Sequence, residues 1–191
     1  MLKNLSGTFA AVKAFAQSLS ANPILDAGIP SATPAKRKII FTFGSNEAGV
    51  HLAGAAKCAL DEHGAILGQG VGRQGDSYAI PTKGHYIKPG ETQKRIGRTL
   101  PLTDVENYVN EFLAYAVANP DVDFMVTQIG TGYAGFDSYD IAPLFGDAPS
   151  NCWFDTAWQE IFEEEDITFK YWGTFDNPVD GYEYTPEYLA R

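Results

Sequence analysis

The sequence contains few cysteines, and this shortage excludes several classes of protein. Its 191 residues include only two, Cys58 and Cys152. Neither belongs to a closely spaced pair, so the sequence predicts no disulfide framework, zinc finger or dithiol redox centre. We expect both thiols to be small buried side chains and the protein to work in a reducing cytoplasm. No metal and no cofactor is predicted.

Basic residues are also scarce. The chain has 14 Lys and Arg against 24 Asp and Glu, which gives a formal net charge of −10. Sequence-independent binding of DNA or RNA depends on many Lys and Arg side chains that neutralise phosphates, so no nucleic-acid polymer is expected as a partner. A small anionic ligand is still compatible with this charge, because backbone amides and a few local cations can hold its phosphates.

A long apolar run is missing as well, and the sequence therefore predicts no membrane partner. Near the start of the chain, Lys13 interrupts an apolar stretch whose large side chains recur at helical spacing. This pattern predicts an amphipathic helix over residues 1–22 rather than a secretory signal. The helix could pack on its own domain or on a second subunit, which would make a homo-oligomer.

The composition changes along the chain predict three parts. Residues 1–35 hold the helix and a proline-rich connector, residues 36–175 form an α/β domain, and residues 176–191 form a polar tail. Strands are predicted at residues 39–43, 77–83 and 124–126, with an edge strand at 167–171. Helices are predicted from Leu52 to His63 and from Thr103 to Asn119, the second with a capping box formed by Thr103 and Glu106. Strand and helix alternate, which indicates a layered α/β fold.

Two polar stretches are predicted to be irregular. Residues 68–75 are rich in glycine, but they follow no clear strand and open no helix, so they fail the context test for a dinucleotide-binding motif. Residues 84–101 are predicted as a long surface loop that carries a local positive patch and could close over a site. The basic residues of this patch are Lys88, Lys94, Arg95 and Arg98.

The most informative stretch is the glycine loop, residues 129–137, which follows the predicted strand at 124–126. Gly130, Gly132 and Gly135 lie within six residues of one another. Because glycine leaves the backbone unshielded, several N–H groups of this loop can converge on one anionic group. The alternative is a tight turn without a ligand.

The glycine loop and the stretch after the first strand together resemble the two ligand loops of macro domains, which recognise ADP-ribose. Asn46 and the run Gly54-Ala55-Ala56 are similar to the first loop of that family, and residues 129–136 to the second. The string from Phe43 through residues 74–83 resembles more closely a macro-domain-like family found in bacteriophages and bacteria. The resemblance covers about residues 39–158 and implies a three-layer α/β/α fold with a mixed central sheet.

The resemblance also implies roles for the loop residues. The glycine loop would wrap a diphosphate, with Phe136 beside a ribose or base, and Asn46 would bind the distal ribose hydroxyls. Gly49, Gly54 and Ala55 would let the helix start approach the phosphates. The diphosphate-binding residues of the glycine loop would be Gly130, Thr131, Gly132, Tyr133, Ala134 and Gly135.

Catalysis is less clearly indicated than binding. Ala53 and Ala134 stand where two hydrolytic subclasses of macro domains carry an acid. Lys83 is similar to the lysine of the subclass that removes ADP-ribose from glutamate. Other acid–base groups could substitute for the missing acids. The candidates are His51, Asp137 and Asp140.

Three functions are compatible with these observations. The favoured one is a binder of ADP-ribose or a related, linear or cyclic, nucleotide, which in a phage could sequester or clear a host-defence signal. The second is a hydrolase or lyase of ADP-ribosyl bonds that uses Lys83 with Asp137 or Asp140. The third is a non-catalytic interaction scaffold that oligomerises through the N-terminal helix.

Overall fold

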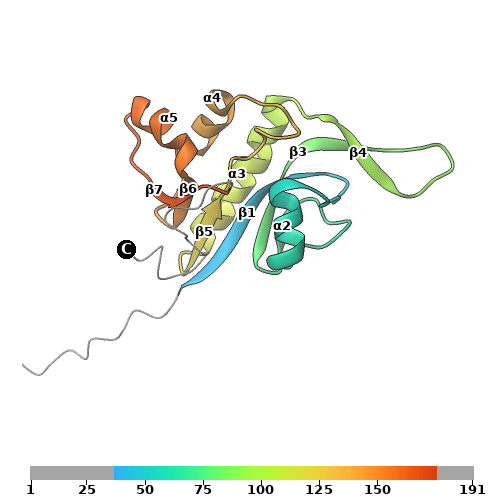
Figure 1. Ribbon diagram of the computed structural model, residues 1–191, viewed down its shortest axis with the longest axis horizontal. Helices are drawn as coiled ribbons and strands as arrows, with labels where there is room; N and C mark the ends of the chain where they lie inside the picture. Colours follow the sequence, from blue (N-terminus) through green and yellow to red (C-terminus); the bar gives the residue numbers. More distant parts are fainter. Residues whose placement is uncertain (1–36, 176–191) are drawn as a thin grey trace, which may run out of the picture. The chain divides into compact units, whose positions relative to one another are not determined.

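The computed structural model describes residues 37–175, which form one mixed, mostly parallel sheet of seven strands with four α-helices (Figure 1). The predicted α/β class is therefore confirmed. The predicted N-terminal amphipathic helix, the connector before residue 37 and the tail at 176–191 lie outside the described residues. Within the described part of the chain, no helix has the length and apolar character needed to cross a lipid bilayer.

The strands follow the order β2-β3-β1-β5-β6-β7, and β4 pairs with β3 beside this path. All pairings among β1, β3, β5, β6 and β7 are parallel, whereas β2 and β4 run antiparallel to β3. The strands are β1 Lys38–Asn46, β2 Gly72–Gln74, β3 Ser77–Ile87, β4 Lys94–Thr99, β5 Val122–Val126, β6 Cys152–Asp155 and β7 Lys170–Gly173. The helices are α2 Gly54–Glu62, α3 Leu102–Ala118, α4 Ser138–Ile141 and α5 Gln159–Glu164, with short 3₁₀ turns at Ala142–Phe145 and Thr156–Trp158.

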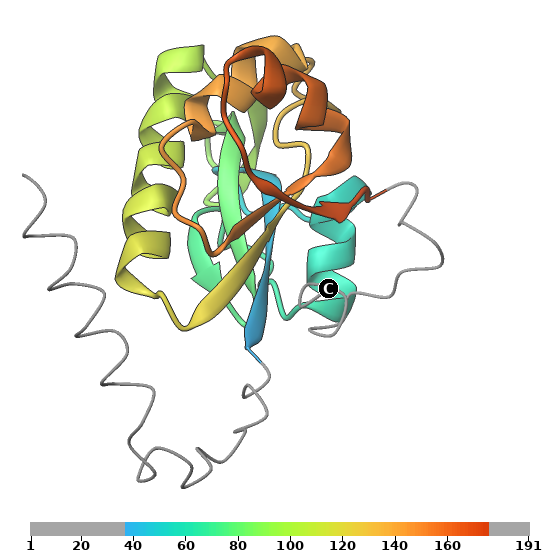
Figure 2. The same ribbon diagram turned by 90° about the vertical axis from the view of Figure 1, so that its left-hand side faces the viewer.

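The central strands are apolar on both sides because helices cover both faces of the sheet, and Figure 2 shows α2 and α3 on opposite sides. On one face, Ile40 and Phe124 pack with Phe112 of α3 in one hydrophobic cluster. On the other face, Phe41 packs with Ala59 of α2 in a second cluster. The alternation of side chains along a strand sends neighbouring residues into different cores, which explains the near-continuous apolar run of β1.

Aromatic side chains fill much of the larger cluster. Phe154 is fully buried and lies edge-on to Phe162, with ring centroids 5.0 Å apart. Trp158 is also fully buried and contacts Phe145, with centroids 5.6 Å apart. These ring contacts attach α5 and the 3₁₀ turns to the sheet.

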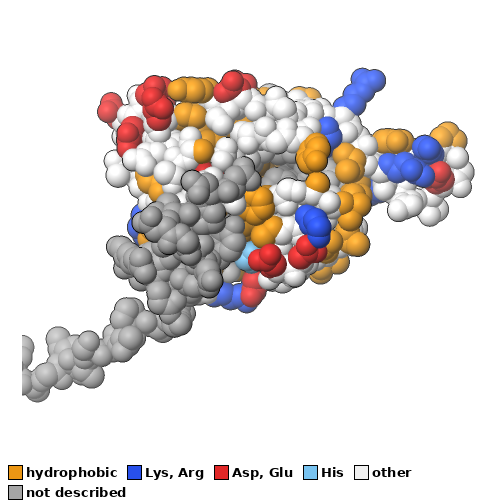
Figure 3. Space-filling model, in the orientation of Figure 1, with side chains coloured by type: hydrophobic (Ala, Val, Ile, Leu, Met, Phe, Trp, Pro, Cys, Tyr) orange, Lys and Arg blue, Asp and Glu red, His pale blue; other side chains and the backbone are white. Residues whose placement is uncertain are grey.

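Residues 84–101 differ from the prediction of an irregular loop. β3 continues to Ile87, and β4 pairs with it in an antiparallel hairpin in which His85 faces Ile96. The strand signal is weak in the sequence because Tyr86, Ile87 and Ile96 are about half exposed and stand among charged residues. Lys and Arg side chains gather over this hairpin, whereas Asp and Glu gather over α4 and α5 (Figure 3).

Four smaller predictions are also corrected. Pro101, not Thr103, is the N-cap of α3, and no side chain caps that end, so the predicted capping box is absent. The helix expected from Leu52 starts at Gly54, and residues 72–74 of the glycine-rich segment form β2 on the edge of β3. Cys152 is buried as predicted, whereas Cys58 is only partly buried.

Candidate functional site

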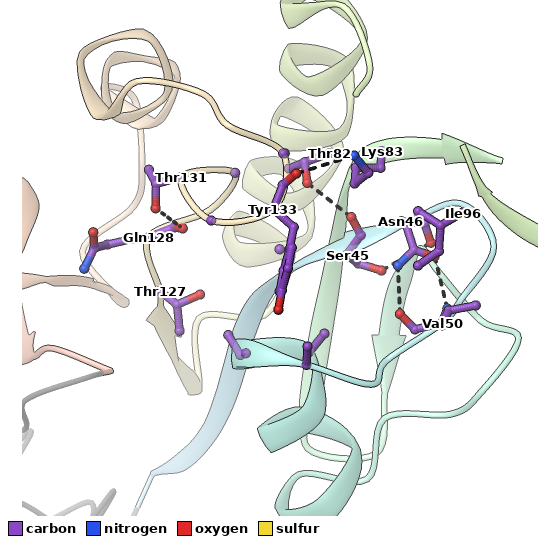
Figure 4. A pocket seen from close by; sticks show the side chains of 18 of the residues that line it. Ser45, Asn46, Val50, Thr82, Lys83, Ile96, Thr127, Gln128, Thr131 and Tyr133 are labelled. Carbon is purple, nitrogen blue, oxygen red and sulfur yellow. Dashed lines mark hydrogen bonds between the residues drawn. The ribbon is translucent and has the colours of Figure 1, made fainter. Parts of the chain in front are cut away.

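A pocket with a volume of about 570 Å³ opens at the carboxyl ends of β1 and β5, beside β3 (Figure 4). Ligands of open α/β sheets bind at this edge, because loops from neighbouring parallel strands meet there. The lining comes from the end of β1, the stretch after it, the start of α2, the middle of β3 and the glycine loop. The lining residues are Gly44, Ser45, Asn46, Val50, Leu52, Ala53, Gly54, Ala55, Ala56, Thr82, Lys83, Ile96, Thr127, Gln128, Gly130, Thr131, Gly132, Tyr133, Ala134 and Phe175.

The glycine loop is closed by its own backbone. The N–H of Phe136 donates to the carbonyl of Gly130 at 3.1 Å, and the N–H of Gly135 donates to the carbonyl of Gly132 at 2.9 Å. Among the hydrogen bonds of residues 37–175, none has a donor among the backbone N–H groups of residues 130–134. All five of these residues line the pocket. The loop thus offers a run of consecutive amide donors at the pocket wall.

At two positions of this wall, the close approach of neighbouring atoms leaves room only for glycine. Gly130 has φ of +81°, and a Cβ there would lie 3.1 Å from a ring carbon of Phe136. At the end of β1, a Cβ on Gly44 would lie 3.3 Å from the amide nitrogen of Gly130. Gly132 is different, because a Cβ there would meet no atom within 4 Å. At position 132 the absence of a side chain therefore keeps the pocket open instead of relieving a clash.

The start of α2 supplies a second set of amide donors. Ala53 is the N-cap, with extended φ and ψ of −154° and 160°, and no side chain caps the helix. The next three residues, 54–56, line the pocket with the glycine loop. The N–H groups of the first turn of a helix have no partner inside the helix, and the helix dipole makes this end favourable for an anion. Both sets of donors therefore border one cavity.

Lys83 is the one charged side chain among the described residues that line the pocket, and no carboxylate lines it. Its Nζ lies 3.4 Å from the carbonyl oxygen of Tyr133 and 3.5 Å from Oγ1 of Thr99. The Thr99 hydroxyl in turn donates to the carbonyl of Ala134 at 2.9 Å. β3 and β4 thus hold the glycine loop in place and put a positive charge beside it, in a protein whose net charge is strongly negative.

Asn46 lines the pocket, but its side chain also holds its own loop. Its Nδ2 donates to the carbonyl of Val50 at 2.8 Å, and its Oδ1 accepts from the Val50 N–H at 3.0 Å. Gly49, by contrast, does not line the pocket. It has φ of +68°, and a Cβ there would lie 2.3 Å from the carbonyl carbon of Gly68. The structure thus gives Gly49 a packing reason to be glycine, and its proposed contact with a ligand stays a prediction.

Apolar and aromatic side chains form the rest of the wall. Tyr133 is 83% exposed and projects over the cavity, and Ile96 borders it from the hairpin (Figure 4). Phe175 lines the cavity as well, and its backbone N–H donates to Oδ2 of Asp155 at 3.2 Å. Asp155 is fully buried, and this burial raises the pKa of its carboxyl.

Of the four catalytic candidates, only Lys83 lines the pocket. Asp137 is the N-cap of α4, where its carboxylate accepts from the Tyr139 N–H at 2.9 Å, and Asp140 is exposed in the first turn of that helix. His51 is fully buried, and its Nε2 lies 2.9 Å from the carbonyl oxygen of Gln69. Burial lowers the pKa of His51, which favours a neutral ring.

The predicted ligand-binding residues of the two loops also divide into those that line the pocket and those that do not. Gly54, Ala55 and residues 130–134 line the pocket, whereas Gly135 and Phe136 do not. Phe136 packs against the larger hydrophobic cluster instead. Sequence reasoning missed Thr127 and Gln128, although two polar residues directly after a buried strand are a usable signal. It also missed Ile96 and Phe175, for which the sequence offers no comparable pattern.

A second hollow of about 600 Å³ lies between the hairpin and the stretch after β1, and Ile96 borders both cavities. Glu47 lies here, with Oε2 2.8 Å from Nδ1 of His85 and Oε1 accepting from the Tyr108 hydroxyl at 2.9 Å. The bond to His85, together with that from Tyr108, lowers the pKa of Glu47 against the effect of burial. Burial and the neighbouring Glu47 raise the pKa of Tyr108 to about 12. Glu47 therefore joins the hairpin to α3.

Comparison of the chain with known proteins finds no match among protein-family models, curated proteins or solved structures.

Proposed function

We propose that this protein binds ADP-ribose or a related ribonucleotide with a diphosphate, linear or cyclic, in the pocket between the glycine loop and α2. In this proposal the domain is a three-layer α/β/α module of the macro-domain type. The observation that carries the proposal is the convergence of two sets of amide donors, residues 130–134 and 54–56, on one cavity.

A diphosphate suits this arrangement better than a single phosphate. Two separate backbone segments offer N–H groups, so each phosphate could receive donors from one segment. Lys83 adds a nearby positive charge, and no carboxylate among the described lining residues repels an anion. The cavity volume of about 570 Å³ also falls within the range of small-molecule and cofactor sites.

The remaining lining suits a ribose and a base. The tyrosine and phenylalanine rings of Tyr133 and Phe175 offer flat apolar surfaces on which a base can stack. Thr127 and Gln128 lie at the cavity wall. The Thr127 hydroxyl donates to the Thr42 carbonyl at 3.0 Å and the Gln128 amide hydrogen-bonds the Asp155 carboxylate, so each side chain would offer a ribose hydroxyl its oxygen as an acceptor. These residues would set the preference among nucleotides, while the backbone amides would supply affinity for any diphosphate.

Binding is the favoured activity because the acid–base groups needed for hydrolysis do not gather in the pocket. Lys83 lines it, but Asp137 and Asp140 do not. General acid–base catalysis needs a group within hydrogen-bond reach of the reacting atom. A hydrolase that uses Lys83 alone is the second candidate, and mass spectrometry of ADP-ribosylated peptides incubated with the protein would reveal its product.

Isothermal titration calorimetry with ADP-ribose, cyclic ADP-ribose isomers, AMP and ribose 5-phosphate tests the proposal. We expect saturable heat with ADP-ribose or a cyclic isomer, and weaker binding of the two monophosphates. No heat with any of the four compounds would contradict the nucleotide proposal and leave the interaction scaffold as the better account.

A further inference from the structure

A group of potential metal ligands lies at the carboxyl end of α2, away from the helix start that lines the pocket. Three potential ligand atoms lie within 4.8 Å of one another: the thiol sulfur of Cys58, a carboxylate oxygen of Glu62 and a ring nitrogen of His63. The sequence does not suggest this group, because its single cysteine lacks the second cysteine or histidine pair of a zinc finger.

The helix geometry explains how these side chains meet. Cys58 and Glu62 are four residues apart and therefore lie on one face of α2, one turn from each other. His63 is the C-cap, and its φ and ψ of −119° and 13° take it off the helical path. Its ring stacks on Phe41, with centroids 4.4 Å apart and an angle of 6° between the planes. This stacking fixes the imidazole beside the helix end.

The three ligand types suit one class of cation. Sulfur, nitrogen and oxygen together are the ligand set of Zn²⁺ and similar borderline ions, whereas Mg²⁺ and Ca²⁺ prefer oxygen alone. In a tetrahedral zinc site, the ligand atoms are roughly 3.3–3.8 Å apart. The observed separations, 4.8 Å or less, need only a small rotation of side chains to reach this range, and Glu62 is exposed and free to make it.

The backbone at this end of α2 favours a cation as well. Carbonyl groups without helical partners and the negative end of the helix dipole lie at this end of α2. Asp61, which precedes Glu62, is ion-paired with Lys57, and Asp76, which acts electrostatically on His63, is ion-paired with Lys38 and Arg73, so these side-chain charges are largely balanced. Burial, together with the negative charges of Glu62 and Asp61, raises the pKa of the Cys58 thiol to about 11, so a metal ion would have to displace the thiol proton.

We propose that Cys58, Glu62 and His63 bind one zinc-class divalent cation, with a fourth position open to water or an exogenous ligand. The ion would connect the last turn of α2 to its C-cap and so hold the helix whose other end borders the pocket. This site is independent of the nucleotide proposal, and neither depends on the other.

Spectroscopic titration of the full chain with Co²⁺, after removal of metal by a chelator, tests the site. We expect a thiolate-to-cobalt charge-transfer band in the near ultraviolet, visible bands of tetrahedral intensity, and loss of both on addition of one equivalent of Zn²⁺. Cys58→Ser should abolish the charge-transfer band, and Cys152→Ser, which changes the other thiol, should retain it.

Glu62→Gln keeps the test valid if the other variants fail to fold, because Glu62 is exposed. We expect this variant to keep the melting temperature of the metal-free protein and to bind Zn²⁺ at least about tenfold more weakly. A wild-type protein without a charge-transfer band, a band that persists in Cys58→Ser, or unchanged Zn²⁺ affinity in Glu62→Gln would overturn the proposal.

Discussion

Replacement of Gly132 by valine should separate ligand binding from folding. A Cβ at this position meets no atom within 4 Å, and the residue lines the pocket, so the valine methyl groups would project into free space above the amide donors. We therefore expect the free energy of unfolding to change by less than about 1 kcal/mol. The substitution should instead block the approach of the ligand to the neighbouring N–H groups.

The expected loss of affinity follows from the number of donors that become inaccessible. A hydrogen bond to a charged group contributes roughly 1.5–3 kcal/mol, so loss of two amide–phosphate bonds costs about 3–6 kcal/mol. This corresponds to an increase in Kd for ADP-ribose of about 10²- to 10⁴-fold. Calorimetry measures the Kd, and thermal denaturation checks the fold. Ala114→Val, which adds similar bulk on an exposed face of α3, is the matched control.

A Kd within about threefold of wild type in a folded Gly132→Val protein would refute the reasoning, because it would show that the glycine loop does not hold the phosphates.

Substitutions at four further positions test other parts of the structure. Ala53→Ser should cap α2 and raise stability by about 0.5–1.5 kcal/mol in urea denaturation, while it weakens ADP-ribose binding because the hydroxyl occupies donors of the first turn. Lys83→Met should raise the Kd for ADP-ribose by about tenfold and reduce the dependence of that Kd on salt, since it removes the cation of the lining. Asn151→Ala should destabilise by about 2–4 kcal/mol in urea denaturation and Asn151→Asp by more, because its buried Nδ2 lies within 3.1 Å of three backbone carbonyl oxygens. Glu47→Gln should destabilise the fold near neutral pH and lose this effect in acid. The folded-state pKa of Glu47 is below its ordinary value, so its carboxylate stabilises the fold above the unfolded-state pKa and ceases to do so as the pH falls through the folded-state pKa.

For each of these predictions, one result would contradict the reasoning. An Ala53→Ser protein that binds ADP-ribose as tightly as wild type would show that the helix start does not contact the ligand. An unchanged salt dependence in Lys83→Met would exclude a direct charge interaction. Equal stabilities of Asn151→Ala and Asn151→Asp would mean that the carbonyl oxygens do not face the side chain. A Glu47→Gln effect that is the same at about pH 7 and about pH 3 would contradict the assigned pKa shift.

The sequence predicts the central strands and the two pocket loops because their signals are local. An apolar run at residues 39–43 requires cover on both faces, and three glycines after residue 129 mark a turn with open backbone. The end of β3 beyond Lys83 and the whole of β4 escape prediction because they face solvent, so Tyr86 and Ile96 give no clear alternation of buried and exposed positions.

Roles of residues that depend on contacts between distant segments also cannot be predicted from the sequence. Gly49 is glycine because the segment at Gly68 packs on it, and that contact brings together parts of the chain that no local pattern connects. Asp137 is the last residue of the glycine loop, yet it caps α4 and does not line the pocket as Lys83 does. Phe175 reaches the pocket only because β7 lies beside β6.

The most direct test of the central claim is a ¹⁵N–¹H correlation spectrum of the full chain, recorded during titration with ADP-ribose. Amide protons that donate to phosphate move downfield. We expect saturable downfield shifts at residues 130–134 and 54–56, with the same apparent Kd as in calorimetry. Saturable shifts confined to other residues, or no shifts at millimolar ligand, would contradict the claim that these two sets of backbone amides bind the diphosphate.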